Sequence, residues 1–273
     1  MEIALLLIAG GVGAGVFGSL LGLGGGILIV PLLTFGFNVP LREAVGVSLI
    51  CVIVTSSASA GVFLQRQTAN LRLGMVLELF TAGGALLGGL VAFLLDERVL
   101  SGLFAALLVY VAVSMIRPRR EPADGDPETT TTPARGVDRW FARVAGPDYG
   151  IRRPVAGIVG SVAAGVASAL LGIGGGLVKV PVMHIVMGVP LRVATATSNL
   201  MIGITASTSA WVYLLRGGID PYATGTMAIG VFVGATAGAR LAPRVDVRAL
   251  RLLFAIVLGY TALRMALRAL AQS

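Results

Sequence analysis

Two glycine-rich turns are the features whose residue types and spacing could bind a small anion. Each reads Gly-x-Gly-Gly-Gly, ends one apolar stretch and opens another, at Gly22–Gly26 and at Gly172–Gly176. A helix that begins inside the membrane presents unpaired N–H groups and the positive end of its dipole. Two such starts facing each other would attract an oxyanion without a full positive charge. The alternative is that these glycines only permit tight packing or a plain turn.

Small polar residues on the helices that follow the turns are a second set of candidate ligands. Three hydroxyl residues recur after each turn with spacing i, i+7 and i+11, namely Ser48, Thr55 and Ser59, and Ser198, Thr205 and Ser209. This spacing places each set within about 40° on one helix face. Thr197 and Asn199 flank Ser198. Hydroxyl and amide groups can donate to the oxygens of sulfite or a sulfonate, whereas the alternative is that they only mediate helix packing.

Three ionisable side chains within apolar segments could supply charge or carry a proton. Lys179 is the only lysine and follows the second glycine turn, where it could balance an anion; alternatively it snorkels to the membrane surface. His184, the only histidine, could relay a proton or be a hydrogen-bonded packing residue. Glu78 could carry the coupling proton or pair with an arginine at a helix end.

These residues together form the predicted site. The predicted substrate-binding residues are Gly24, Gly25, Gly26, Ser48, Gly174, Gly175, Gly176, Lys179, Thr197, Ser198 and Asn199. His184 and Glu78 are candidates for coupling. The single cysteine, Cys51, has no activating base near it in sequence and indicates neither a disulfide framework nor a metal cluster. We therefore expect no catalytic residue, no metal and no cofactor, and no enzyme activity.

The elements that must position these residues are membrane-spanning helices. Hydrophobic residues make up 56% of the 273-residue chain and charged residues 12%, about half the charged share of a soluble domain. Apolar blocks such as 71–95 and 250–269 have the roughly 20 residues that a bilayer core about 30 Å thick requires. The net charge of +8 comes mostly from arginines at helix ends, which the positive-inside rule explains. No basic stripe is interleaved with aromatic residues, so nucleic acid is excluded as a partner.

The chain repeats itself at an offset of 150 residues without a gap. Both glycine turns, the following proline and the tetrapeptide Val-Pro-Leu-Arg recur at that offset. We place a first transmembrane repeat at 1–117, a polar cytoplasmic linker at 118–152 and a second repeat at 153–273. The predicted helical segments are 3–21, 25–37, 44–64, 72–95 and 98–116, and then 154–171, 175–187, 194–215, 221–242 and 247–269.

An odd number of crossings per repeat would turn the second repeat upside down relative to the first. The second segment of each half is short and contains a proline, so it could cross the membrane or form a hairpin with the segment before it. Either pattern gives an all-α, polytopic protein with two inverted repeats and Gly-broken short helices, as in many secondary transporters. If one short segment does not pair with the segment before it, the halves are parallel instead. The linker is expected to lie inside the cell, and the chain in the inner (plasma) membrane. A homodimer remains open.

The doubled glycine turn, Pro31 or Pro181, the Val-Pro-Leu-Arg motif and the stretches 44–48 and 196–199 resemble the sulfite exporter TauE/SafE family, also called the toluene sulfonate uptake permease family. The resemblance covers both halves outside the linker. It implies transport of sulfite, of sulfonates such as sulfoacetate, or of related organic anions, commonly as export.

The resulting hypothesis is a secondary transporter, exporting sulfite or a small organosulfonate by alternating access. The alternatives are an anion channel, a transporter of another small organic anion, and a membrane-embedded enzyme or sulfur-relay protein using Cys51. The hypothesis depends on the two glycine turns lying together, buried and outside unbroken helices.

Overall fold

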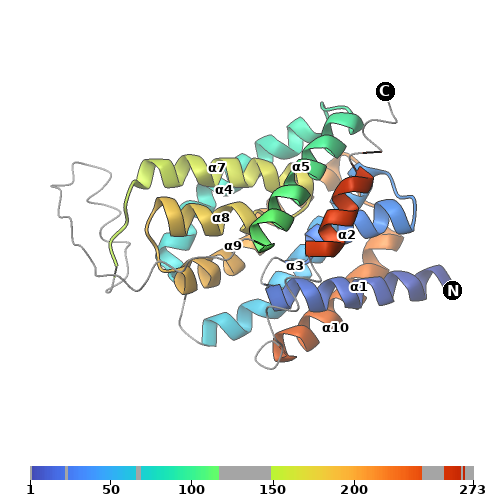
Figure 1. Cartoon of the computed structure of the whole chain (residues 1–273), viewed down its shortest axis with the longest axis horizontal. Coiled ribbons are helices and arrows are strands. Elements are labelled where there is room, and N and C mark those ends of the chain that lie inside the picture. The colour runs from blue at the N-terminus through green and yellow to red at the C-terminus, as the bar shows by residue number, and fades with distance from the viewer. Residues whose placement is uncertain are drawn as a thin grey trace.

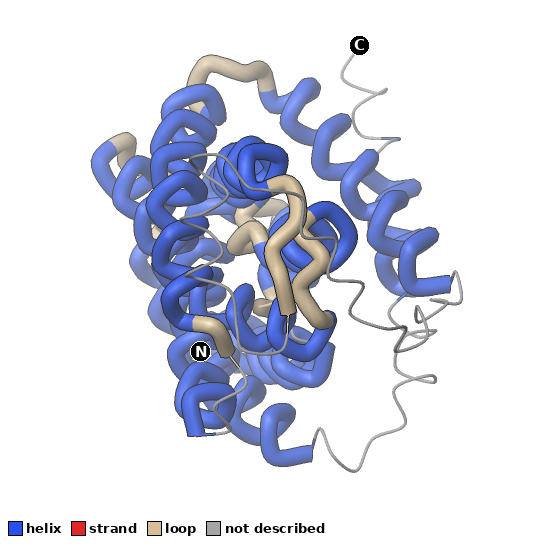
Figure 2. The backbone as a smooth tube through the Cα atoms, turned by 90° about the vertical axis from the view of Figure 1, so that its left-hand side faces the viewer, coloured by secondary structure: helices blue, strands red, loops and turns tan. Residues whose placement is uncertain are grey.

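The computed structural model describes residues 2–21, 24–65, 69–116, 149–241, 255–265 and 267. Within these ranges the chain consists of helices joined by short loops and contains no strand (Figure 2). The predicted all-α class is confirmed. The predicted linker lies outside the described residues, apart from residues 149–152.

The helices of the two halves follow each other in the same order. The first half contains α1 (Glu2–Leu21), α2 (Gly26–Pro31), the π-helix η1 (Leu32–Gly36), α3 (Leu41–Gln65), α4 (Leu71–Ala92) and α5 (Glu97–Ile116). The second contains α7 (Pro154–Leu171), α8 (Gly176–Pro181), the π-helix η2 (Val182–Val186), α9 (Leu191–Leu215) and α10 (Pro221–Leu241). A further apolar helix, Ala255–Met265, follows. The bounds of α8, η2 and α9 are those of α2, η1 and α3 shifted by 150 residues.

Five of the helices in the described ranges are long and apolar enough to cross a membrane. They are Glu2–Leu20, Leu41–Ala58, Leu71–Ala92, Pro154–Leu171 and Pro221–Leu241. Their outer faces carry large apolar side chains, with Leu79 at 73%, Val159 at 64% and Ile229 at 60% exposure. Apolar side chains on the outside of the protein suit a lipid environment, so the chain is a multi-pass membrane protein.

The fourth α-helix of each half packs along the first α-helix of the other half. α1 packs along α10, α4 packs along α7, and α3 packs against α9 between these pairs. Figure 1 shows the α1–α10 and α4–α7 pairs on opposite sides of the central helices. In the same view α1 runs away from the N-terminus at the right, whereas α7 begins at the left and runs to the right.

Glycines allow α4 and α7 to cross at backbone contact, as the Gly-x-x-x-Gly pattern predicts. A methyl group on Gly84 would collide with the carbonyl oxygen of Val162, and one on Gly165 would collide with that of Thr81. The equivalent crossing of α10 and α1 uses Gly234 in the same way. The two halves therefore contact each other at two equivalent helix crossings, both lined by glycine.

Replacing Gly84 with leucine is therefore expected to force α4 away from α7 and to lower the yield and thermal stability of the purified protein sharply. Overpacking of this kind costs about 1–3 kcal/mol or more. Gly83→Leu is the matched control, because Gly83 is exposed and a methyl group on it would meet no heavy atom within 4 Å. Equal melting temperatures in detergent for the two variants would contradict the crossing.

The short second segment of each half is too short to span a bilayer core by itself and packs against the preceding helix. α8 and η2 have six and five residues, about 16 Å at 1.5 Å per residue, against a bilayer core of about 30 Å. The N–H group of Arg152, before α7, donates to the carbonyl oxygen of Met187, after η2, at 2.8 Å. This contact is the one that the hairpin alternative expects for the second half. In the first half, a methyl group on Gly10 of α1 would meet Leu32 of η1.

Candidate functional site

The two glycine turns meet in the centre of the protein, between the halves. Residues 24–25 and 172–175 lie outside regular helix and are buried. A methyl group on Gly26 would collide with the carbonyl oxygen of Gly172. The Ser48 hydroxyl on α3 donates to that same oxygen at 2.7 Å, and lies 3.3 Å from the carbonyl oxygen of Gly26. Gly22 and Leu23 lie outside the described residues, but residues 24–26 and 172–176 are brought together as predicted.

The backbone of both turns requires glycine, which alone adopts positive φ without strain. The φ angle is 76° at Gly24, 75° at Gly25, 72° at Gly174 and 76° at Gly175. Gly25 and Gly175 are the N-caps of α2 and α8, and neither helix start has a side-chain cap. The first N–H groups of these short helices therefore have no side-chain acceptor from a cap.

Two apolar side chains occupy the space between the turns. Val52 of α3 and Ile202 of α9 are 0% and 1% exposed and are equivalent in the repeat. A methyl group on either Gly24 or Gly174 would lie within 3.5 Å of both side chains. Val52 and Ile202 thus close the centre of the protein in this conformation.

Ser198 and Asn199 supply polar groups that lack a protein partner. Within the described part of the chain, neither the Ser198 hydroxyl nor the Asn199 side-chain nitrogen has a hydrogen-bond partner, although the residues are 1% and 5% exposed. A methyl group on Gly176 would lie 3.4 Å from the Ser198 oxygen. A buried polar group without a partner is costly, so these two groups are candidates for contact with a ligand.

Two other predicted site residues lie away from the turns. The Thr197 hydroxyl accepts from the N–H group of Asn70, at the start of α4, at 3.0 Å. His184 donates from Nδ1 to the carbonyl oxygen of Val189 at 3.0 Å, as the packing alternative expected. Both residues hold neighbouring segments together in this conformation.

The deeper hydroxyls bond within their own helices, apart from Thr205. Thr55 donates to the carbonyl oxygen of Cys51 and Ser209 to that of Thr205, which fits the packing alternative for these two residues. The side chain of Ser59 is not among those that the structure describes.

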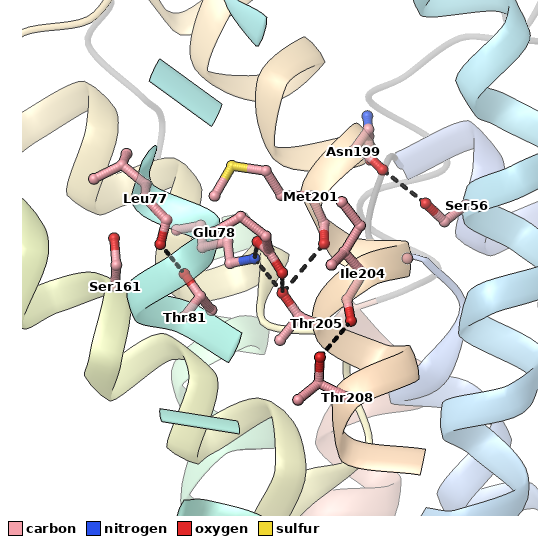
Figure 3. A network of polar contacts seen from close by, with 12 residues as sticks. Ser56, Leu77, Glu78, Thr81, Ser161, Asn199, Met201, Ile204, Thr205 and Thr208 are labelled. Carbon is pink, nitrogen blue, oxygen red and sulfur yellow. Dashed lines mark hydrogen bonds and ion pairs between the residues drawn. The ribbon is translucent and has the colours of Figure 1, made fainter. Parts of the chain in front are cut away.

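A buried ion pair beside the second glycine turn joins the two halves. Lys179 Nζ lies 2.7 Å from Glu78 Oε2 and also donates to the Thr205 hydroxyl. Thr205 in turn donates to Glu78 Oε1 at 2.6 Å, and Figure 3 shows Glu78 on α4 and Thr205 on α9 pointing toward each other. Lys179 is 2% exposed, so the snorkelling alternative is wrong, and the partner of Glu78 is this lysine rather than an arginine.

Sequence reasoning singled out Glu78 and Lys179 separately but missed that they pair. A usable signal was present, because each lacks a charged equivalent: Ala228 stands opposite Glu78 in the repeat, and Ile29 stands opposite Lys179. Each of these charges lies in an apolar segment and has no charged equivalent in the other half. Pairing with the opposite charge lowers the free-energy cost of burying each of them. Lys179 also adjoins the turn, since a methyl group on Gly175 would lie 3.6 Å from its Cε atom.

An open groove of about 270 Å³ runs between α3 and α9. Its lining includes Ser56, Ser57 and Ser207, with Gly203 at the helix contact. The Ser56 hydroxyl donates to the backbone oxygen of Asn199 at 2.8 Å (Figure 3). The groove therefore reaches the helix segment that carries Ser198 and Asn199.

Comparison with known proteins agrees with this architecture. The family model described as sulfite exporter TauE/SafE matches residues 7–265. The probable membrane transporter protein YunE of Bacillus subtilis is 27% identical, over 93% of this chain and 94% of its own length. A probable membrane transporter protein of Haemophilus influenzae is 26% identical, over 97% of this chain and 98% of its own length. No solved structure matches this chain. The matched model spans both repeats, and the chain therefore belongs to the sulfite exporter TauE/SafE family, as a multi-pass membrane transporter rather than an enzyme.

Proposed function

We propose that this protein is a secondary transporter that exports sulfite or a small organosulfonate, such as sulfoacetate, by alternating access. The observation that carries the proposal is the meeting of two broken, uncapped helix starts in the buried centre, next to the unpartnered hydroxyl of Ser198. Backbone N–H groups and neutral donors suit an oxyanion with several acceptor oxygens. The name of the family, sulfite exporter TauE/SafE, supports sulfite as the cargo class.

In the proposed site, Gly24–Gly26 and Gly174–Gly176 supply backbone donors, Ser198 and Asn199 supply side-chain donors, and Lys179 supplies charge. Ser48 holds the two turns in register through its bond to Gly172. Thr197 positions the α9 segment through Asn70. In this conformation the side chains of Val52 and Ile202 fill the proposed anion site. They must move apart before a substrate can enter.

Alternating access follows from the relation between the halves. The opposite chain directions of α1 and α7 (Figure 1) support an inverted repeat in the inner membrane, with the linker on the cytoplasmic side. Tilting one half against the other would open the centre first to one side and then to the other. The groove between α3 and α9 is the proposed approach to the site on one of these sides.

Transport by reconstituted vesicles tests this function. Vesicles loaded with unlabelled sulfite or sulfoacetate are expected to take up the labelled anion by saturable exchange, while taurine and acetate compete less well. A large conductance driven by the gradient alone, without exchange, would instead identify an anion channel. Absence of flux for every sulfur oxyanion, with flux of another organic anion, would overturn the proposed cargo.

Replacing Ser198 with alanine is expected to weaken anion binding about tenfold while leaving the melting temperature of the empty protein unchanged. The hydroxyl has no protein partner to lose among the described residues, whereas a hydrogen bond to a charged ligand contributes about 1.5–3 kcal/mol. Affinity is read from the anion-dependent thermal shift of purified protein. Thr208→Val is the matched control, because this exposed hydroxyl bonds the carbonyl oxygen of Ile204 in its own helix. Wild-type affinity in the Ser198 variant would remove Ser198 from the site.

A further inference from the structure

The Glu78–Lys179 pair crosses the boundary between the two halves, at the place where they must move relative to each other. Glu78 belongs to α4 of the first half, whereas Lys179 belongs to α8 and Thr205 to α9 of the second. All three side chains are buried, with Glu78 at 4%, Lys179 at 2% and Thr205 at 0% exposure. The contact therefore depends on the relative position of the halves and adjoins the second glycine turn.

The fold itself does not require this pair. The repeat-equivalent positions carry Ala228 and Ile29, and Ile29 is 0% exposed in the same helical setting. A buried ion pair is in general no more stabilising than a well-packed apolar pair of similar volume. Charges retained at one of two equivalent positions inside a membrane protein therefore indicate a role in transport.

We propose that the transported anion competes with Glu78 for Lys179, and that Glu78 takes up one proton when the anion binds, so that proton and anion move together. This inference rests on the proposed function. Before binding, the Lys179 ammonium and the Glu78 carboxylate neutralise each other. When an anion takes the place of the carboxylate at Lys179, Glu78 would become a buried charge without a partner, which is strongly unfavourable.

Protonation of Glu78 removes that penalty. A dianion such as sulfoacetate that moves with one proton still carries one net negative charge, so an interior-negative membrane potential favours its exit, as the proposed export requires. The proton comes from water on the side to which the site is open and forms an O–H bond with one carboxylate oxygen of Glu78. The pair has a net charge of zero before binding. In the bound state the anion contacts Lys179 and Glu78 is a neutral carboxylic acid. The protein has thus gained one anion and one proton. Release on the other side reverses both steps, because the carboxylate returns to Lys179.

Thr205 is placed to accommodate both states of Glu78. Its hydroxyl proton has two acceptors within reach, Glu78 Oε1 at 2.6 Å and the carbonyl oxygen of Met201 at 3.2 Å. With the carboxylate ionised, the hydroxyl donates to Glu78. With Glu78 protonated, the hydroxyl turns to Met201 and accepts the new O–H. Thr205 is thus a positioning residue for the proton.

Other ionisable groups near Glu78 are engaged elsewhere. In the described ranges, the elements around Glu78 carry Arg72, His184 and Tyr213 in addition to Lys179, and α7 carries no ionisable side chain. Arg72 is exposed, His184 donates to Val189, and Tyr213 donates to the carbonyl oxygen of Ala169. The side chain of Arg192, in the first turn of α9, is not among those that the structure describes.

Proton flux in vesicles containing the full-length protein tests the inference with sulfoacetate as probe, because its charge is constant between about pH 6 and about pH 8. The expected result for the unaltered protein is one proton carried with each sulfoacetate, and accumulation of sulfoacetate on the alkaline side of an imposed pH gradient. Sulfoacetate exchange without proton flux would overturn the inference and leave the proposed function standing. Absence of flux for every sulfur oxyanion would overturn the proposed function and the inference with it.

Variants then locate the proton. Glu78→Gln removes the carboxylate partner of Lys179 and is expected to lower the yield of folded protein. The protein that folds should keep sulfoacetate exchange but lose at least about tenfold in proton-driven accumulation, because the amide imitates the protonated acid. Glu2→Gln makes the same change at an exposed carboxylate and is expected to retain full coupling. Thr205→Val should reduce proton flux more than exchange, and Thr205→Ser should restore it. Full coupling in a folded Glu78→Gln protein would overturn the role of Glu78.

Discussion

Lys179→Met alone is expected to remove most of the folded protein, and any protein that remains folded is expected to bind no sulfonate. The substitution leaves the Glu78 carboxylate buried with only the Thr205 hydroxyl as partner among the described residues. Breaking a buried ion pair by removing one member costs about 3–5 kcal/mol, a large part of the roughly 5–15 kcal/mol by which proteins are stable. The yield from membranes and the melting temperature of the purified protein measure this loss.

The double variant Glu78→Ala with Lys179→Ile separates the structural effect from the functional one. It places at these positions the apolar residues that stand at the repeat-equivalent positions, Ala228 and Ile29, so stability should return most of the way to that of the parent. Sulfoacetate transport should remain absent, because the charge that holds the anion is gone. Transport by this double variant would show that Lys179 has no part in the site. Failure of the double variant to recover stability would show that the fold does require the pair.

The repeat pattern allowed much of the fold to be predicted, since the same local signals occur twice. Glycine turns end α1 and α7, and the helices α3 and α9 begin within three residues of the predicted bounds at 44 and 194. The close crossing at Gly84 was predictable because small residues four apart permit backbone contact. The meeting of the turns across the halves could be expected because the substrate site of transporters built from repeats lies at the interface between the repeats.

Contacts that depend on three-dimensional register were harder to predict. Lys179 was predicted to face a ligand, yet in this conformation it faces Glu78, because the α4–α7 crossing brings a helix of the first half to that point. The π-helices η1 and η2 were not predicted. Each follows a proline, at 31 or 181, whose missing N–H group interrupts the regular hydrogen-bond ladder. Thr197 and Ser198 are adjacent in sequence but contact different segments: Thr197 bonds Asn70 at the start of α4, and Ser198 lies beside Gly176. The position of a residue on its helix does not show which segment packs there.

Gly26→Ala is expected to reduce transport by about 10- to 100-fold, the second large effect that the structure predicts. The added methyl group would meet the Gly172 carbonyl oxygen at less than contact distance, and would also crowd Val52 and Ser48. The backbone at Gly26 does not have a positive φ, so the effect is steric rather than conformational. Overpacking costs about 1–3 kcal/mol, and about 1.4 kcal/mol corresponds to a factor of ten in binding.

Gly36→Ala, at the other end of the same broken helix, is the matched control. Its nearest neighbour would be a Leu32 methyl carbon at 3.7 Å, an ordinary contact, so exchange of sulfoacetate should remain at the level of the unaltered protein. If Gly26→Ala and Gly36→Ala transport equally well, the contact between the turns is not needed for binding. If only Gly26→Ala fails while its melting temperature without ligand is retained, the loss lies in the geometry of the two helix starts. The anion would then be held where the halves meet, rather than by either repeat alone.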